Sequence, residues 1–308
     1  MSPFDRFEIT MEKAEEILSE GLGKKVKVRS LERMSGGMIC SVFHARLGTK
    51  PVDVILKVKA GSAESEDFEH QFRVLEFLAK NTKFPVPEPY FFHTEKGKDP
   101  VSALVLGFLP GKNLGECSLT SSQRKELEAQ IALSVVDLHK HRRETFGSIF
   151  EKGSRTWVEV FRKKMEDTLP VCRQRLDSKT FTRVEEIVDC LQHFFKGRDV
   201  VASLVHGDIW ATNVIVDLRN DKVLLSGFVD PSAIYADPEY ELAYLEVFRT
   251  VGEEFFRTYR QHFRIDPGYE VRKMLYHLHT MLVHVKVFGD ASYIRRTEQL
   301  ANLLLQNL

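Results

Sequence analysis

The chain has 308 residues, which is enough for one large domain or two ordinary ones. Lysine and arginine together number 44, as do aspartate and glutamate, so no overall charge favours nucleic acid or an anionic membrane. No segment resembles a transmembrane span or a secretory signal, and the four cysteines lack CxxC spacing. These features predict a cytoplasmic protein with free thiols and no nucleic-acid or membrane partner, and they leave the oligomeric state open.

The first third of the chain is predicted to be mainly strands with two helices. Its hydrophobic spacing indicates helices where apolar residues recur every three or four positions, and strands where they alternate. Three prolines between positions 84 and 90 forbid a helix there. In order, the expected elements are a helix over residues 10–22, a strand over 26–31, a second strand after the paired glycines near residue 36, a third strand over 52–59, a helix over 64–80, an extended segment over 84–90, and a strand over 101–109.

The remainder is predicted to be mainly helical. Thr120 and Gln123 form a capping-box pattern that opens the first of these helices. Further helices are expected over residues 157–165, 181–195, 239–259, 271–288 and 293–305. His277 and His284 share one face of the helix over 271–288, and we interpret them as core or pocket-lining residues rather than metal ligands.

A polar loop between two apolar runs carries the clearest chemistry. The segment 206–213 reads HGDIWATN, with Asp208 and Asn213 separated by four residues. The protein-kinase catalytic loop has the same spacing, in which the Asp meets the acceptor hydroxyl and the Asn binds magnesium. A polar turn between two strands is the alternative interpretation.

A second acidic landmark follows at hairpin distance. Two short β-branched and aliphatic runs, 214–216 and 223–225, are separated by the polar residues 217–222, which predicts a hairpin. Because a hairpin returns the chain to its start, Asp230 is expected near Asp208 and Asn213. An Asp before a Pro is often only a turn former, but this placement favours a metal ligand.

The strand over 52–59 is third in order and carries two lysines on one face. Kinases use a lysine on the third strand to hold phosphates. Lys57 is the better candidate because apolar residues flank it, whereas Lys59 precedes Ala60 and Gly61 and resembles a frayed end. The paired glycines near residue 36 either make an ordinary turn or let backbone N–H groups approach a phosphate.

Together these segments resemble the aminoglycoside phosphotransferase superfamily of small-molecule kinases, and within it the fructosamine kinases. The resemblance covers roughly residues 26–300. It rests on the segments SGGM, VILKV, LVLGFLPG, LVHGDIWATNV and FVDPSAIYADPEYELA, with HGDIWATN close to that family's HGDLWSGN. It implies an α+β, protein-kinase-like bilobal fold: a small lobe of antiparallel sheet plus helix (1–109) and a larger, mainly helical lobe (110–308).

The resemblance also implies roles for individual residues. Asp208 would be the catalytic base, and Asn213 and Asp230 would bind Mg²⁺. Binding of ATP, in the cleft between the lobes, would involve Lys57, Ser35, Gly36, Gly37, Met38, Gln71 and the hinge residues Leu106 and Phe108. The acceptor side would include Trp210, Tyr235, Asp237 and Glu239.

Two positions depart from the family pattern. Gln71 stands where a Glu is expected to pair with the lysine, so it can accept a hydrogen bond from Lys57 but adds no charge. Glu69 lies on another face of the same helix and is a poor substitute. Ala211 and Thr212 replace the Ser-Gly or Pro-Gly usual before the Asn, which permits a different loop backbone.

Three functions follow from these observations. The first is an ATP-dependent kinase for a hydroxyl of a sugar amine or a related small metabolite. The second is a non-catalytic nucleotide-binding pseudokinase, suggested by Gln71. The third is a protein kinase, which is disfavoured because only about ten residues separate Asp230 from Glu241 and leave no room for a peptide-presenting segment.

Overall fold

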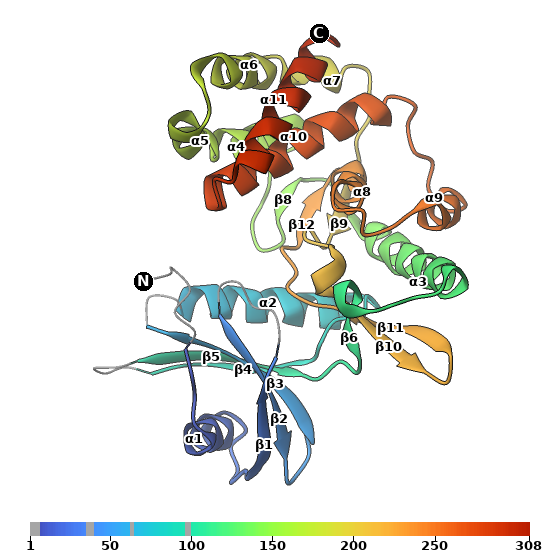
Figure 1. Ribbon diagram of the computed structural model, residues 1–308. Coiled ribbons are helices and arrows are strands. Elements are labelled where there is room, and N and C mark those ends of the chain that lie inside the picture. The colour runs from blue at the N-terminus through green and yellow to red at the C-terminus, as the bar shows by residue number, and fades with distance from the viewer. Residues whose placement is uncertain (1–6, 35–39, 62–64, 96–99) are drawn as a thin grey trace. The chain divides into compact units, whose positions relative to one another are not determined.

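The structure is a computed structural model that describes residues 7–34, 40–61, 65–95 and 100–308. It divides into two compact units (Figure 1). The first unit comprises Met1–Leu119 and Thr212–Ser232, and the second comprises Thr120–Ala211 and Ala233–Leu308. The sequence predicts a single boundary after residue 109, whereas these units divide after residue 119 and the first also takes in residues 212–232.

The first unit is built mainly from antiparallel strands. Its elements are α1 (Met11–Gly21), β1 (Val28–Arg33), β2 (Ser41–Leu47), β3 (Asp53–Ala60), α2 (Ser65–Asn81), β4 (Pro89–Thr94), β5 (Val101–Gly107), β6 (Lys112–Asn113), the 3₁₀ turn η1 (Leu114–Glu116), β10 (Val214–Arg219) and β11 (Lys222–Phe228). The larger sheet has the order β1-β2-β3-β5-β4, and a second sheet has the order β11-β10-β6.

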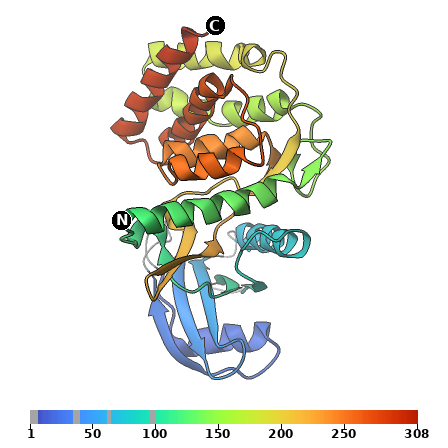
Figure 2. The ribbon, with the colours of Figure 1, turned by 90° about the vertical axis from the view of Figure 1, so that its right-hand side faces the viewer.

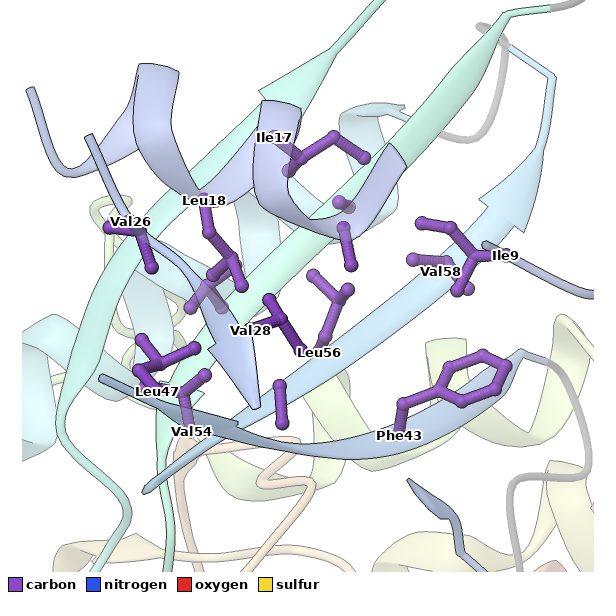
Figure 3. Close-up of a cluster of buried hydrophobic side chains, with 14 of the residues drawn as sticks. Ile9, Ile17, Leu18, Val26, Val28, Phe43, Leu47, Val54, Leu56 and Val58 are labelled. Atoms are coloured by element: carbon purple, nitrogen blue, oxygen red, sulfur yellow. The ribbon is translucent and has the colours of Figure 1, made fainter. Parts of the chain in front are cut away.

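Strand alternation in the larger sheet sends successive side chains to opposite faces. Val54, Leu56 and Val58 of β3 face α1 and join a core cluster with Ile17 and Leu18 of that helix (Figure 3). The residues between them face the other way. A second cluster on that side contains Phe68 and Leu75 of α2, Leu104 and Leu106 of β5, and Ile55 of β3. The two helices therefore cover opposite faces of one sheet.

The predicted hairpin after residue 213 is confirmed. Strands β10 and β11 pair antiparallel, from Val214 opposite Phe228 to Arg219 opposite Lys222. Asn220 and Asp221 link them with positive φ angles of 50° and 61°, the backbone of a two-residue hairpin turn. Strand β10 also pairs with β6 near Lys112, which explains why this segment belongs with the first unit.

The second unit is mainly helical, with four short strands. Its elements are α3 (Ser121–His139), β7 (Arg142–Arg143), β8 (Gly147–Ser148), α4 (Trp157–Glu166), α5 (Leu169–Arg175), α6 (Ser178–Asp189), α7 (Leu191–Phe194), β9 (Ala202–Val205), β12 (Ile234–Ala236), α8 (Pro238–Val247), α9 (Glu253–Arg260), α10 (Tyr269–Val287) and α11 (Ala291–Leu305). Helix α10 packs against α8 and α11, and the red α11 lies beside it in both views (Figures 1 and 2). The turn η2 (Ala211–Asn213) links the units.

The helix beginning at Thr120 is confirmed, with its capping box: Gln123 N donates to the Thr120 hydroxyl and Thr120 N donates to Gln123. Two other helix predictions were wrong in extent. The helix expected over 181–195 ends at Asp189 and is followed by the short α7. Helix α5 was not predicted at all.

The helix expected over 239–259 is also two helices. Helix α8 ends where Arg249 adopts a φ of 52°. There Thr250 N donates to Leu245 O and Arg249 N donates to Glu246 O, which is the Schellman arrangement that closes a helix. Arg249 occupies the position that glycine usually takes, so the sequence carries no obvious stop signal at this point. Helix α9 starts after Gly252.

Within the described residues, no helix is both long enough and apolar enough to cross a lipid bilayer.

Candidate functional site

Lys57 is buried beneath α2 because it alternates with the apolar residues of β3 that face α1. Its ammonium nitrogen donates to Gln71 Oε1 at 2.9 Å and contacts Asp230 Oδ1 at 2.6 Å. Burial alone would lower the pKa of Lys57, but the attraction of Asp230 outweighs it and raises the pKa above its ordinary value. Lys57 is therefore a charged ammonium held by one carboxylate and one amide. The predicted hydrogen bond between Lys57 and Gln71 is confirmed.

Asp230 reaches Lys57 because the hairpin brings the chain back to its start. Val229 N donates to Asn213 O at 3.0 Å, so the residues before β10 and after β11 are adjacent. Gly227 permits a close approach, since a Cβ there would lie 2.6 Å from Pro85 O. Asp230 has a φ of 55°, which is rare for a non-glycine residue, and its side chain is 48% exposed. Residues in rare backbone conformations cluster at functional sites, and this half-exposed carboxylate is a candidate for such a role.

Asn213 and Asp230 offer the oxygen ligands that magnesium prefers. Asn213 is buried at the end of η2, and Asp230 is half exposed. In the described part of the chain, no group of three or more His, Cys, Asp or Glu residues comes together as a metal cage. Two protein ligands fit a magnesium ion that completes its shell with water and phosphate oxygens.

The loop carrying Asp208 is held through its backbone by Glu241 of α8. The Glu241 carboxylate accepts from His206 N at 2.9 Å and from Gly207 N at 2.7 Å. Gly207 has a φ of 83°, a conformation that favours glycine. These two bonds fix the direction in which the next residue, Asp208, leaves the backbone.

Glu241 is fully buried, and a second layer of side chains supports it. His139 Nε2 lies 3.4 Å from Glu241 Oε2, and His139 Nδ1 lies 2.8 Å from the hydroxyl of Tyr259. Burial would raise the pKa of Glu241, but hydrogen bonding and attraction from His139 and His206 more than offset it and lower the pKa. The loop therefore rests on a charged carboxylate. A glutamate placed between Tyr240 and the apolar run Leu242–Leu245 was the available sequence signal for it.

Tyr244 contacts Asp208 directly, and the sequence analysis missed it. The Tyr244 hydroxyl donates to Asp208 Oδ1, and its ring lies 5.0 Å from that of Phe248. Burial and then the charge of Asp208 raise the pKa of Tyr244, so the phenol stays protonated and can donate. The spacing from Glu241 to Tyr244, three residues on one helix, was the signal that could have found it.

The four residues expected on the acceptor side occupy different environments. Trp210 is half-buried, with its ring 6.2 Å from that of Phe248. Tyr235 is also half-buried, and the guanidinium of Arg143 lies 4.2 Å from its ring centre. Both retain accessible aromatic surface.

Asp237 and Glu239, in contrast, are buried in an ion-pair network. Asp237 accepts from Arg198 Nη2 at 2.9 Å, from the Tyr276 hydroxyl at 2.6 Å and from Glu239 N at 3.0 Å, and so caps α8. Glu239 pairs with Arg272 Nε at 2.8 Å and with Arg198 Nη2 at 3.0 Å. Their burial leaves them no exposed surface for an acceptor, and they hold the start of α8 instead.

The remaining sequence candidates lie in the first unit. Leu106 is buried in the cluster beneath α2, and the ring of Phe108 stacks on His44 at 4.3 Å. Ser35, Gly36, Gly37 and Met38 lie outside the described residues. The expectation that Lys59 is a frayed end was wrong: it is buried, and its ammonium lies 2.9 Å from Asp67 Oδ2.

His277 and His279 of α10 are buried, and His284 on the same helix is half-buried. His277 Nε2 lies 2.9 Å from Ala243 O, and His284 Nδ1 lies 2.8 Å from Thr280 O. Burial lowers the pKa of His277 to about 4 and that of its neighbour His279 to about 3, so both rings are neutral at physiological pH.

Comparison with known proteins is consistent with this geometry. Residues 10–307 match the family described as fructosamine kinase. A protein of Vibrio cholerae named "probable ketoamine kinase" is 26% identical over 94% of this chain and 96% of its own length. The chloroplastic protein-ribulosamine 3-kinase of Oryza sativa subsp. japonica is 26% identical over 89% of this chain and 78% of its own length. A Synechocystis relative, named "probable ketoamine kinase slr1563", is 28% identical, but the match spans 49% of each chain.

Solved structures confirm the fold. A crystal structure from Haemophilus somnus, provisionally named fructosamine-3-kinase, superposes with a TM-score of 0.74 at 20% identity, covering 95% of this chain and 96% of that chain. The GDP complex of aminoglycoside 2′-phosphotransferase-IIIa gives a TM-score of 0.69 at 14% identity, covering 97% and 99%. The predicted α+β, protein-kinase-like fold is therefore correct. The chain belongs to the fructosamine kinase family and is an ATP-dependent phosphotransferase with an alcohol group as acceptor.

Proposed function

We propose that this enzyme transfers the γ-phosphate of ATP to a hydroxyl of a small sugar amine, with Asp208 as the base. Lys57 binds phosphate oxygens, and Asn213 and Asp230 hold Mg²⁺. The observation that carries the proposal is the convergence of Lys57, Gln71 and Asp230 from a strand, a helix and the end of a hairpin. A half-exposed carboxylate in a rare backbone conformation beside a buried lysine is the arrangement that phosphate and metal binding requires.

The chemistry asked of these residues is mainly positioning and charge neutralisation. When bound, the magnesium ion neutralises charge on the phosphates and orients them. Lys57 supplies a fixed positive charge for the phosphate oxygens. Asp208, held by Glu241 through the loop backbone, orients the acceptor hydroxyl and takes its proton. Ser35 to Met38, and the backbone near Leu106 and Phe108, stay predictions for contacts with the phosphates and the adenine.

The acceptor class comes from the relatives and not from the geometry. Two relatives carry names that specify ketoamine and ribulosamine kinases. A ketoamine combines a polyhydroxylated sugar with an amine, and so offers the alcohol that the family phosphorylates. Of the expected acceptor residues, Trp210 and Tyr235 retain accessible aromatic surface, and we keep these two as acceptor contacts. We propose the cytoplasm as the compartment, since the four cysteines are free thiols.

The test is magnesium-dependent ADP production with a panel of acceptors. The panel contains an N-alkyl 1-amino-1-deoxyfructose, the matching ribulosamine, two aminoglycosides, choline and a Ser/Thr peptide. We expect turnover on a ketoamine, and we expect Asp208→Asn to lower it by about 100-fold or more while ATP binding is kept.

Two outcomes would contradict this proposal. Near-normal turnover of Asp208→Asn would remove Asp208 as the base. ATP binding without turnover on any acceptor would favour the pseudokinase instead, for which Gln71 in place of the expected carboxylate beside Lys57 is the motivating observation.

A further inference from the structure

Helix α8 contacts the Asp208 loop at two points, three residues apart on one helical face. Glu241 accepts from the backbone of residues 206 and 207, while Tyr244 donates to the side chain of Asp208. Residues three apart on a helix point in similar directions, so one rigid element sets both the loop backbone and the carboxylate. The first contact fixes where the loop runs, and the second fixes how its functional side chain is turned.

Tyr244 is well placed for such a role because it has little freedom of its own. Its side chain is half-buried, and its ring lies 5.0 Å from the ring of Phe248, which in turn lies 6.2 Å from Trp210. The start of α8 is anchored by Asp237 and Glu239 through Arg198 and Arg272. Because the ring is packed and the helix is anchored, the position of the Tyr244 hydroxyl is fixed. Only one orientation of the Asp208 carboxylate can accept its hydrogen bond, so Tyr244 selects that orientation.

We propose that Tyr244 is a positioning residue for Asp208, holding one carboxylate oxygen so that the other faces the acceptor hydroxyl. This inference rests on the proposed function of Asp208 as the base. A carboxylate has two oxygens with about four lone-pair sites, and the bond from Tyr244 occupies one of these sites. The phenol remains a donor throughout turnover, because burial and the charge of Asp208 raise its pKa.

A different role would give the opposite kinetics. If the Tyr244 hydroxyl merely occupied the position of the acceptor hydroxyl, each acceptor would have to displace it, and its removal would improve binding. The packing against Phe248 opposes displacement, since the ring would have to leave its aromatic neighbour whenever an acceptor bound.

The experiment is a double-mutant cycle of Tyr244→Phe and Asp208→Asn, assayed with the N-alkyl 1-amino-1-deoxyfructose. Tyr244→Phe keeps the ring and removes only the hydroxyl. Tyr269→Phe is the matched control, because it also removes a phenol hydroxyl that donates to a carboxylate, here Glu246 Oε2 at 2.7 Å and not a residue of the loop. If no acceptor in the panel is phosphorylated, the same cycle is run on ATP hydrolysis, in which water replaces the acceptor.

We expect Tyr244→Phe to lower kcat about 10-fold with the acceptor KM unchanged within about two-fold, and Tyr269→Phe to leave both unchanged. In the Asp208→Asn background, Tyr244→Phe should have no further effect, because the residue acts only through Asp208. Asp208→Asn alone tests the proposed function, so its failure is separable from failure of this inference.

Three results would overturn the role of Tyr244. An unchanged kcat in Tyr244→Phe would show that the hydroxyl does not orient the base. A lower acceptor KM would identify Tyr244 as a stand-in for the acceptor. If the fold-reductions in kcat of the two single variants multiplied in the double variant, the two residues would act independently, which would indicate a general structural role for Tyr244.

Discussion

Two Asp-Pro pairs lie seven residues apart in the segment VDPSAIYADPE, and the structure gives them opposite positions. The side chain of Asp230 is 48% exposed, in a backbone with a φ of 55°, and contacts one buried lysine. Asp237 is 0% exposed, has an ordinary φ of −63°, caps α8 and contacts Arg198 and Tyr276. Asp237 makes enough bonds to satisfy its oxygens within the protein. Asp230 remains open to a ligand.

The difference between Asp230 and Asp237 separates a carboxylate that stabilises the fold from one that can bind a ligand. A buried carboxylate with several protein partners holds elements together, and its loss leaves several buried donors without their acceptor. A half-exposed carboxylate in a strained backbone contributes little to stability, because water screens its single ion pair. The same dipeptide therefore serves the scaffold in one place and a ligand site in the other.

The largest expected effect is on folding. Asp237→Asn turns an amide towards donors of Arg198 and Tyr276, so we expect it to lower the free energy of unfolding by about 3 kcal/mol or more. Urea denaturation followed by circular dichroism measures this. Asp230→Asn is the matched control; it should cost less, about 1–2 kcal/mol, because its amide oxygen still accepts from the buried Lys57. Equal costs for the two variants would contradict the assignment of Asp237 to the scaffold.

The next largest effect is on turnover, and here Asp230→Asn is expected to be the more damaging of the two variants. Asp230→Asn removes the charge that we assign to the magnesium ion, so we expect kcat to fall about 100-fold or more while the protein stays folded. The measurement is the ketoamine-dependent rate over a range of magnesium concentrations. Asp237→Asn, assayed at low temperature where it is folded, should keep most of its specific activity. Full activity of Asp230→Asn would remove it from the metal site.

The sequence predicted local features of the chain better than the distant residues that support them. The spacing from Asp208 to Asn213 and the hairpin before Asp230 are local features, so the loop and the hairpin could be predicted. The partner of Asp237 is Arg198, which lies 39 residues away, and no local pattern reveals that it is buried there. Tyr244 was missed for the same reason, since its importance depends on which face α8 turns to the loop. Arg249 shows a third limit, because a residue other than glycine ends that helix.

The smallest expected effect concerns the other partner of Lys57. Gln71 accepts from Lys57 at 2.9 Å without adding charge, so Asp230 is the carboxylate that contacts this ammonium. Gln71→Glu would give Lys57 a second anionic partner. Lys57 would then bind Asp230 less strongly and compete less with the magnesium ion for that carboxylate. We expect the magnesium concentration for half-maximal rate to fall about two- to five-fold, the range of a partly exposed ion pair. A titration of magnesium at fixed ATP measures it.

Glu69→Gln is the matched control for this substitution. Glu69 is exposed on the same helix, two residues before Gln71, and water and salt screen its charge. We therefore expect the magnesium concentration for half-maximal rate of Glu69→Gln to differ from that of the unsubstituted enzyme by less than about 1.5-fold. The opposite result would be a higher magnesium requirement in Glu69→Gln and an unchanged one in Gln71→Glu. It would show that Glu69 is the functional carboxylate of α2, and that Lys57 does not compete with the metal for Asp230. A fall in Gln71→Glu alone would show that Asp230 is divided between Lys57 and the cation, which is what its open position allows and the buried position of Asp237 forbids.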